Sequence, residues 1–306
     1  MKTQVNPRFF ALGSVPSRLT LDANFIPFRG AMRSSRILFI AFFLLGEFSL
    51  YGADLFVDKA LEAAVRQQVF SKRSSKEPLT ADDVKRVSTV RASGKKIRNL
   101  KGLEACKALA SLELPGNEIE DISPLAGLER LQLLDLSGNQ IRNLGPLEKV
   151  NALQYLNMES NEVEDLSPLA GLVNMRSLYL SDNRIAELRP LTKLEKLWSL
   201  YLSGNRIENL SHLSNLKGVK NLDLSKNKVK DLLPLAGMNS LRMLFLQGNR
   251  IEDLAPILET ARKDAVKTRR YAPYLRLWLK GNPITSDSPQ VRDLSKVVRE
   301  VNFSYE

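Results

Sequence analysis

Cysteine and histidine are almost absent from this sequence, since Cys106 and His212 each stand alone among 306 residues. A single cysteine cannot form an internal disulfide, and one cysteine with one histidine cannot build a thiolate–imidazole zinc site. An unpaired cysteine is more often a small buried hydrophobe than a reactive thiol. We therefore expect Cys106 to lie in a core, and we predict no metal site.

Catalytic signatures are missing as well. The sequence contains no G-x-S-x-G elbow, no Gly-rich phosphate loop and no H-E-x-x-H helix. His212 stands in a turn, where we expect a surface residue rather than a general base. No enzyme activity, catalytic residue or cofactor is predicted.

A basic stripe is also missing, although the net charge is +11. The excess lies toward the ends: residues 1–53 hold six basic and two acidic residues, and residues 71–101 hold ten and three. The long middle, residues 102–258, holds seventeen basic and twenty acidic residues. Because a nucleic-acid binder usually carries a basic stripe along its binding face, no nucleic-acid partner is predicted.

Long apolar runs are limited to one segment near the N-terminus, ILFIAFFLL at residues 37–45. Arginines precede it, and the small residues Gly52 and Ala53 follow it, as in a secretory signal peptide. We predict export to the periplasm or the extracellular space through a signal at about residues 32–53, with no stable membrane insertion after cleavage. A buried core helix or an uncleaved anchor is the alternative. Residues 1–31 are interpreted as a start-site artefact or a disordered leader.

The feature that dominates the sequence is a repeat of 22 residues marked by asparagine. Apolar residues stand three, five and eight positions before each asparagine and two positions after it, and a Pro-Leu pair closes most units. The evenly spaced residues are Asn117, Asn139, Asn161, Asn183, Asn205, Asn227 and Asn249, and Asn282 follows after a longer gap.

This pattern predicts a stacked solenoid rather than a helical array, because the L-x-L spacing fits a strand and not a 3.6-residue period. Alternate strand side chains point to opposite faces, so the leucines face the interior. Each asparagine amide is expected to satisfy backbone groups where the chain turns inward, forming a structural ladder. The return path has room only for a short 3₁₀ or helical segment, which the proline begins.

Both ends of the solenoid need a cover. We predict a helical N-terminal cap at residues 54–86, in which Asp58 and Thr80 cap helices, and a helix-containing C-terminal cap at 285–306. The repeats would occupy 87–284 in about nine units. The last unit follows an insertion at 259–273 that is expected to lengthen the helix on the return path.

The repeat resembles the leucine-rich repeat, and its 22-residue form with a closing Pro-Leu is similar to the internalins and to short-repeat protein-phosphatase regulators. The stretches 56–61, 79–83 and 97–104 resemble the helical N-terminal cap of the internalins. This resemblance implies an α/β solenoid: a right-handed leucine-rich-repeat superhelix with a concave parallel β-sheet and a convex side of short segments. It also implies a bacterial secreted protein. No anchoring module follows the repeats here, unlike in many wall-attached internalins, which argues against a cell-surface role of that type.

The residues between the strand leucines face outward on the concave sheet and change from acidic to aromatic along the repeats. Exposed aromatic and arginine side chains dominate binding interfaces, although cross-strand pairing that only stabilises the sheet is the alternative. The predicted partner-binding residues are Tyr155, Tyr179, Trp198, Tyr201, Phe245, Arg276 and Trp278. Glu113 and Asp135 make a carboxylate pair conceivable, but acids at such positions are commonplace and no catalysis is assigned to them.

These observations favour a secreted, non-enzymatic repeat protein that binds a protein partner, or a glycan, through its concave face as a monomer. The alternative is a cytoplasmic scaffold or a phosphatase-regulator-like protein. A processed N-terminus would distinguish the two.

Overall fold

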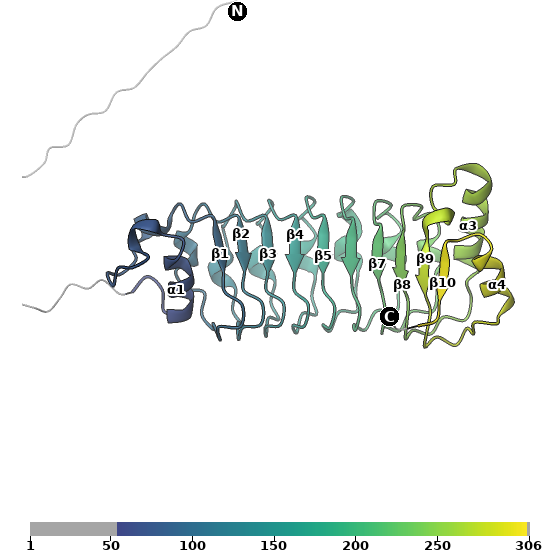
Figure 1. Ribbon diagram of the computed structural model, residues 1–306, viewed down its shortest axis with the longest axis horizontal. Coiled ribbons are helices and arrows are strands. Elements are labelled where there is room, and N and C mark those ends of the chain that lie inside the picture. The colour runs from purple at the N-terminus through teal and green to yellow at the C-terminus, as the bar shows by residue number, and fades with distance from the viewer. Residues whose placement is uncertain (1–53, 305–306) are drawn as a thin grey trace, which may run out of the picture. The chain divides into compact units, whose positions relative to one another are not determined.

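The part of the chain that the structure describes is built around a single parallel sheet of ten strands (Figure 1). The computed structural model describes residues 54–304, so the predicted leader and signal peptide at 1–53 lie outside the described residues. Strands follow one another in sequence order, and each pairs in parallel with the next. They are β1 (Thr89–Arg91), β2 (Ser111–Glu113), β3 (Leu133–Asp135), β4 (Tyr155–Asn157), β5 (Ser177–Tyr179), β6 (Ser199–Tyr201), β7 (Asn221–Asp223), β8 (Met243–Phe245), β9 (Arg276–Trp278) and β10 (Glu300–Asn302).

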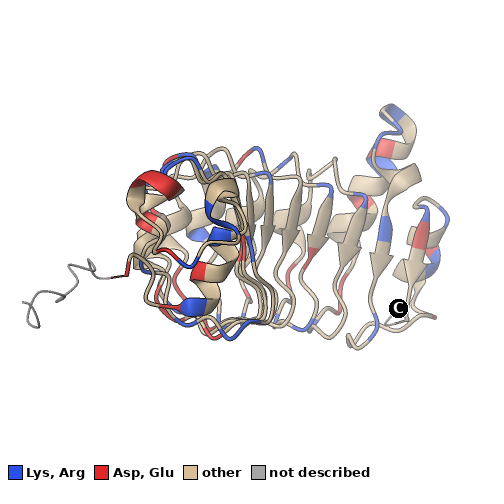
Figure 2. Ribbon diagram, turned by 60° about the vertical axis from the view of Figure 1, so that its left-hand side comes forward, with Lys and Arg blue, Asp and Glu red and all other residues tan. Residues whose placement is uncertain are grey.

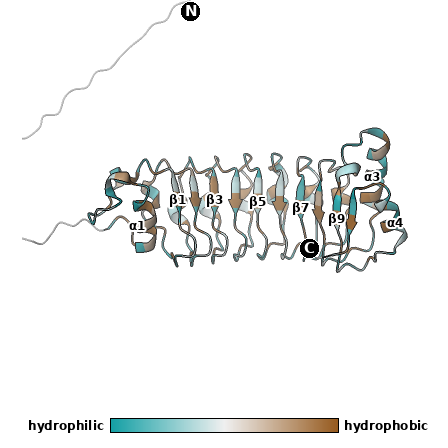
Figure 3. Cartoon of the chain, viewed as in Figure 1, coloured by the Kyte–Doolittle hydropathy of each residue, from teal (hydrophilic) through white to brown (hydrophobic). Residues whose placement is uncertain are grey.

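The interior is built from the leucine positions of the repeat, as the sequence predicts. Strands β1 to β9 each bury their middle residue, and register pairs such as Leu156 with Leu178 and Leu178 with Leu200 stack these residues from coil to coil. The first unit, in which Lys95 stands at the asparagine position, follows the same rule, because Val90 and Ile97 are fully buried. Figure 3 shows the hydrophobic and hydrophilic residues alternating along the coils. No coil could bury these side chains alone, so the core depends on stacking.

Short 3₁₀ turns occupy the return side of the coils, as predicted. Pro124, Pro146 and their equivalents stand in the first turn of these segments, where a missing N–H leaves no hydrogen bond unmade. Along the repeats they are η2 (Leu103–Ala105), η3 (Ser123–Leu125), η4 (Gly145–Leu147), η5 (Ser167–Leu169), η6 (Arg189–Lys193), η7 (Ser211–Leu213) and η8 (Leu233–Leu235).

The asparagine side chains tie each coil to the one before it. Asn183 Nδ2 donates to the carbonyls of Leu180 and Met158 at 3.1 and 2.8 Å, and its Oδ1 accepts from the Val163 N–H at 2.9 Å. Asn139 and Asn205 repeat this arrangement. The amides therefore bond to buried backbone groups of two coils, and the ladder runs from amide to backbone.

At the N-terminal end, α1 (Lys59–Arg66), η1 (Phe70–Lys72) and α2 (Ala81–Val84) precede the first strand. The two predicted helix N-cap residues are confirmed: the Asp58 carboxylate accepts from the N–H groups of Ala60 and Leu61, and Thr80 forms a capping box with Asp83. Asp58 Oδ2 also accepts from the Arg98 N–H at 2.9 Å, which joins α1 to the first coil.

Gly102 lies where this helical end meets the repeats, with φ at +106°, and offers a test of the junction. A Cβ at this position would lie 2.6 Å from the Leu55 carbonyl oxygen and 2.6 Å from a Phe56 ring carbon. We expect Gly102→Ala to lower the free energy of unfolding by about 2–3 kcal/mol, measured by urea denaturation. Gly127→Ala is the control, because φ is +78° there with nothing within 4 Å of the added atom. A loss no larger than in the control would contradict the close contact.

The C-terminal end departs from the regular repeat. In place of a 3₁₀ turn, α3 (Ala255–Lys267) runs for 13 residues and is followed by η9 (Ala272–Tyr274), which confirms the predicted lengthening of the return segment. The Ser288 hydroxyl then caps α4 (Pro289–Ser295). Strand β10 adds to the sheet beyond residue 284, the predicted end of the repeats.

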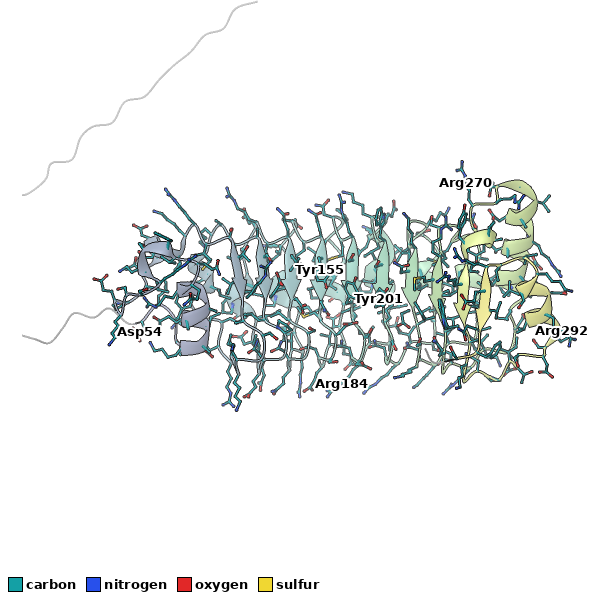
Figure 4. The ribbon with its side chains drawn as sticks, viewed as in Figure 1. Asp54, Tyr155, Arg184, Tyr201, Arg270 and Arg292 are labelled. Atoms are coloured by element: carbon teal, nitrogen blue, oxygen red, sulfur yellow. The ribbon has the colours of Figure 1, made fainter. Side chains whose placement is uncertain are left out.

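Asp264 closes the long helix. Its carboxylate accepts hydrogen bonds from the N–H groups of Arg270, Tyr271 and Ala272 at 3.2, 2.9 and 2.8 Å, and from the Thr268 hydroxyl. The side chain is only 7% exposed. A buried carboxylate is stable there because backbone donors surround it. Beyond it, basic residues of α3 and its following loop are exposed, and Figure 4 shows Arg270 at that outer end.

Candidate functional site

The outward side chains of the strands form one surface, the sheet face, and the strand register places them in rows. In the row before the last leucine of each unit, Tyr179 pairs with Tyr201, Tyr201 with Asp223, and Phe245 with Trp278. A second row, two residues earlier, includes Tyr155 and Arg276. Charged residues gather on the loops and helices, and the strands are drawn largely in tan in Figure 2.

Three of the predicted residues form a continuous tyrosine stack. The ring centroids of Tyr179 and Tyr201 are 4.9 Å apart with an interplanar angle of 13°. Those of Tyr155 and Tyr179 are 5.2 Å apart and tilted by 41°. All three side chains are half-buried on the sheet face, and Figure 4 labels Tyr155 and Tyr201 at mid-sheet. The stack spans β4 to β6 and presents a rigid aromatic surface.

Carboxylates flank the tyrosine stack. Asp135 and Asp223 each accept a hydrogen bond from the N–H of the serine two residues on, at 3.0 and 2.8 Å. In the corresponding turn of its own coil, the Asn157 amide oxygen accepts from the Glu159 N–H at 3.0 Å. Glu159 itself lies on the same face, one row further along the chain. We call Asp135, Glu159 and Asp223 the carboxylate flank.

The flank shifts the titration of its own members. Burial raises the pKa of Glu159, and the nearby carboxylates of Asp135, Asp182 and Asp223 raise it further, against a hydrogen bond from the Ser181 hydroxyl. Burial also raises the pKa of Asp223, more than the hydrogen bonds from its turn lower it. These negative charges therefore lie close together in a partly desolvated setting.

The tyrosine hydroxyls respond to the same surroundings. Burial, then Asp135 and the Tyr179 ring, raise the pKa of Tyr155, and burial, Tyr179 and Asp223 raise that of Tyr201. The stack and the flank are thus one electrostatic neighbourhood, and we call their six residues the tyrosine–carboxylate patch.

The other predicted residues lie apart from this patch. Phe245 and Trp278 stack at 4.3 Å near the C-terminal end, and Trp278 is only 7% exposed. Beside Trp278, Arg276 Nε lies 3.6 Å from Glu300. Trp198 is 59% exposed immediately before β6, with Lys220 Nζ 4.1 Å from the ring centroid. The seven residues therefore divide into a central stack, an edge tryptophan and a C-terminal cluster.

Sequence reasoning missed Glu159 as part of the site. It occupies a third outward row, two residues beyond Asn157, where neighbouring coils carry serine. The strand alternation continues past the last interior leucine, and extending the outward rows by one position would have found it.

The other reactive side chains that the sequence singles out, Glu113, Cys106 and His212, occupy different surroundings. Glu113 pairs with Arg91 at 2.8 Å and accepts from the Ser111 hydroxyl at 3.0 Å. Burial and the Glu104 charge raise the pKa of the Cys106 thiol to about 12, so Cys106 is the buried hydrophobe that was predicted. His212 lies in η7. Within residues 54–304, no group of three or more His, Cys, Asp or Glu side chains is placed to hold a metal ion.

Membrane-spanning structure was also searched for in the described part of the chain. Between residues 54 and 304, no helix combines the length and the apolar character needed to cross a bilayer.

Comparison with known proteins places this architecture in a family. Models described as "Leucine Rich repeats (2 copies)" match residues 129–171 and 173–215, and one described as "Leucine rich repeat" matches 195–251. A search of curated proteins gives no significant match.

Among solved structures, internalin C2 of Listeria monocytogenes is 32% identical, with a TM-score of 0.64 over 66% of this chain and 89% of that one. Internalin F of the same organism is 26% identical, with a TM-score of 0.71 over 82% of this chain and 76% of that one. A plant receptor-kinase ectodomain from Arabidopsis thaliana, solved in complex with CASPARIAN STRIP INTEGRITY FACTOR 2, is 22% identical over 68% of this chain and 25% of that one (TM-score 0.56) and shares the fold.

The stacked coils, the single parallel sheet and these matches define a leucine-rich-repeat solenoid, a fold that typically serves protein–protein interaction. Within that class, the chain belongs to the internalin-like leucine-rich-repeat proteins of bacteria.

Proposed function

We propose that this protein is an exported, non-enzymatic binding protein that captures a protein partner on its sheet face. The observation that carries the proposal is the tyrosine stack at the centre of that face. Tyrosine supplies a large contact area with little loss of side-chain entropy and is enriched among interface hot spots. The plant ectodomain, whose structure holds a bound partner, supports partner capture as a use of this fold.

Structural pairing alone accounts poorly for three neighbouring tyrosines. Cross-strand aromatic contacts stabilise a sheet by about 0.2–1 kcal/mol each, and an aromatic–β-branched pair or a pair of opposite charges contributes as much. The core leucines already hold these strands together. A half-exposed row of aromatic side chains therefore contributes more to binding a partner than to the stability of the fold.

Replacing Tyr179 and Tyr201 together by alanine should weaken partner binding at least tenfold, because each hot-spot side chain contributes about 2 kcal/mol or more. The partner would be captured by the processed chain from the host's growth medium or periplasm and then titrated by calorimetry. Circular dichroism should show an intact fold. Phe70→Ala is the matched control, since Phe70 is 86% exposed in η1, away from the sheet. Equal loss in the control, or none in the double variant, would remove the proposal.

Export is the part of the proposal that concerns residues outside the described range. The expected result is a secreted form that begins after the signal at about residues 32–53, near Ala53. N-terminal sequencing of the protein recovered from each cell fraction measures this. A full-length form found only in the cytoplasm would favour the scaffold alternative instead.

A further inference from the structure

The sheet face is acidic where the tyrosines stand, although the protein as a whole is basic. From β3 to β7, the outward residues at the three rows include Asp135, Glu159 and Asp223 and no lysine or arginine. The net charge of the whole chain is +11. A local negative surface on a positive protein attracts a cation only at close range, since salt screens charges beyond about 8–10 Å.

The fold does not require these negative charges. Asp135 and Asp223 hold turns that Asn157 holds equally well with a neutral amide. Burial disfavours the ionised form of Asp223, and that of Glu159, as the raised pKa values of both carboxyls show. A carboxyl whose ionisation is opposed by burial, at a turn where an amide makes the same hydrogen bond, does not serve stability, which is the pattern of a functional surface.

The ring geometry adds a second feature that suits a cation. Tyr179 covers one face of the Tyr201 ring, so the other face turns toward β7, where Asp223 is the register partner. At the opposite end of the stack, the outer side of Tyr155 turns toward β3, where Leu133 is its register partner and Asp135, two residues on, is near enough to act on the Tyr155 hydroxyl. Each end of the stack thus offers an aromatic face next to a carboxylate. A guanidinium group binds such a pair by stacking on the ring and donating to the acid.

We propose that the tyrosine–carboxylate patch binds a basic, arginine-bearing extended segment of the protein partner. This inference rests on the proposed function and names the chemistry of its ligand. Arginine is favoured over lysine because its planar group stacks on tyrosine and pairs with carboxylate in fixed geometry.

The spacing of the two ends fixes the spacing of the arginines. One end of the stack lies between β3 and β4, and the other lies between β6 and β7. These two places are three strand separations apart, a distance of about 14 Å at ~4.8 Å per separation. An extended segment rises about 3.3 Å per residue, so two arginines about four residues apart would reach both ends. Side chains four residues apart also point to the same side of such a segment.

The probe is a fluorescein-labelled peptide, Gly-Ser-Arg-Ser-Gly-Ser-Arg-Ser-Gly, titrated by fluorescence polarisation against the processed chain. The matched peptide carries citrulline, a neutral isostere, in place of both arginines. The arginine peptide should bind at least about tenfold tighter than the citrulline peptide, and raising the salt to about 0.5 M should remove the difference.

Two neutralised variants locate the effect. Asp135→Asn, Glu159→Gln and Asp223→Asn combined should weaken arginine-peptide binding at least about tenfold. The control combines Glu120→Gln, Glu164→Gln and Glu208→Gln, three exposed carboxyls on the return path that change the net charge equally. It should bind within about twofold of the unmodified protein. The patch variant should also unfold at a temperature no lower than the unmodified protein, because its turns keep an amide acceptor.

Equal binding of both peptides, no binding of the arginine peptide, or equal loss in both variants would overturn the inference. If the arginine peptide does not bind while partner capture still depends on Tyr179 and Tyr201, only the inference of an arginine-bearing ligand is wrong. If capture is independent of those tyrosines, the proposed function itself fails.

Discussion

Asn183→Ala should lower the free energy of unfolding by about 3–4 kcal/mol, because it leaves several buried backbone groups without a partner. The amide donates to the carbonyls of Leu180, Ser181 and Met158, and it accepts from the Val163 N–H. Val163 and Met158 belong to the preceding coil, so the loss falls on the junction between coils. Urea denaturation followed by circular dichroism measures the change.

Asn174→Ala is the control for this substitution. Asn174 also bonds to neighbouring coils, since it donates to the Asn151 carbonyl at 3.0 Å and accepts from Lys196 at 2.7 Å, but it is only partly buried and both hydrogen bonds are exposed. Water replaces exposed partners, so the expected loss is below about 1 kcal/mol. A similar loss of unfolding free energy in the two variants would mean that burial of the asparagine amides does not determine their contribution to stability.

Asp264→Ala is the second change with a large expected effect, about 3–5 kcal/mol, because three backbone N–H groups after α3 lose their acceptor. Two of those groups belong to the buried residues Tyr271 and Ala272. Urea denaturation again supplies the measurement. Asp264→Asn keeps one acceptor oxygen and should lose less. If both variants are as stable as the unmodified protein, the loop after α3 is held by other contacts.

The Asp264 carboxyl also gives the stability a defined pH dependence. Burial opposes its ionisation, yet hydrogen bonds from Thr268 and from three backbone N–H groups hold its pKa below the ordinary value of 3.8. A lowered folded-state pKa stabilises the fold above the unfolded value and ceases to do so as the pH falls through the folded value. Below pH ~4, the unmodified protein should therefore lose stability more steeply than Asp264→Asn.

Most of the architecture could be predicted from the sequence, because the spacing of residues within each repeat specifies the strands and the turns. The L-x-L spacing specifies strands that bury one leucine each, and the prolines specify where the return turns begin. Helix starts are marked by side chains that accept hydrogen bonds from free backbone N–H groups, as Asp58, Thr80 and Ser288 do. These patterns depend on residues close together in the sequence, so they can be interpreted without knowing the tertiary contacts.

The candidate site was less accessible to such reasoning. The sequence places Tyr179 beside Tyr201 through the 22-residue period, but ring orientation and stacking depend on side-chain packing. Trp278 is covered at the C-terminal end, where the inserted helix and β10 break the regular period. Glu159 gains its importance from neighbours on other coils, which no single repeat reveals.

Site-specific photocrosslinking tests the central claim most directly. Benzoylphenylalanine would replace Ser177 or Ser199, which flank the tyrosine stack, and Glu187 or Glu208, which are exposed on the return path. Irradiation in the native host should join a protein partner to the two sheet-face positions and not to the two return-path positions. Adducts that form only from the return path, or from neither set, would contradict binding at the sheet face.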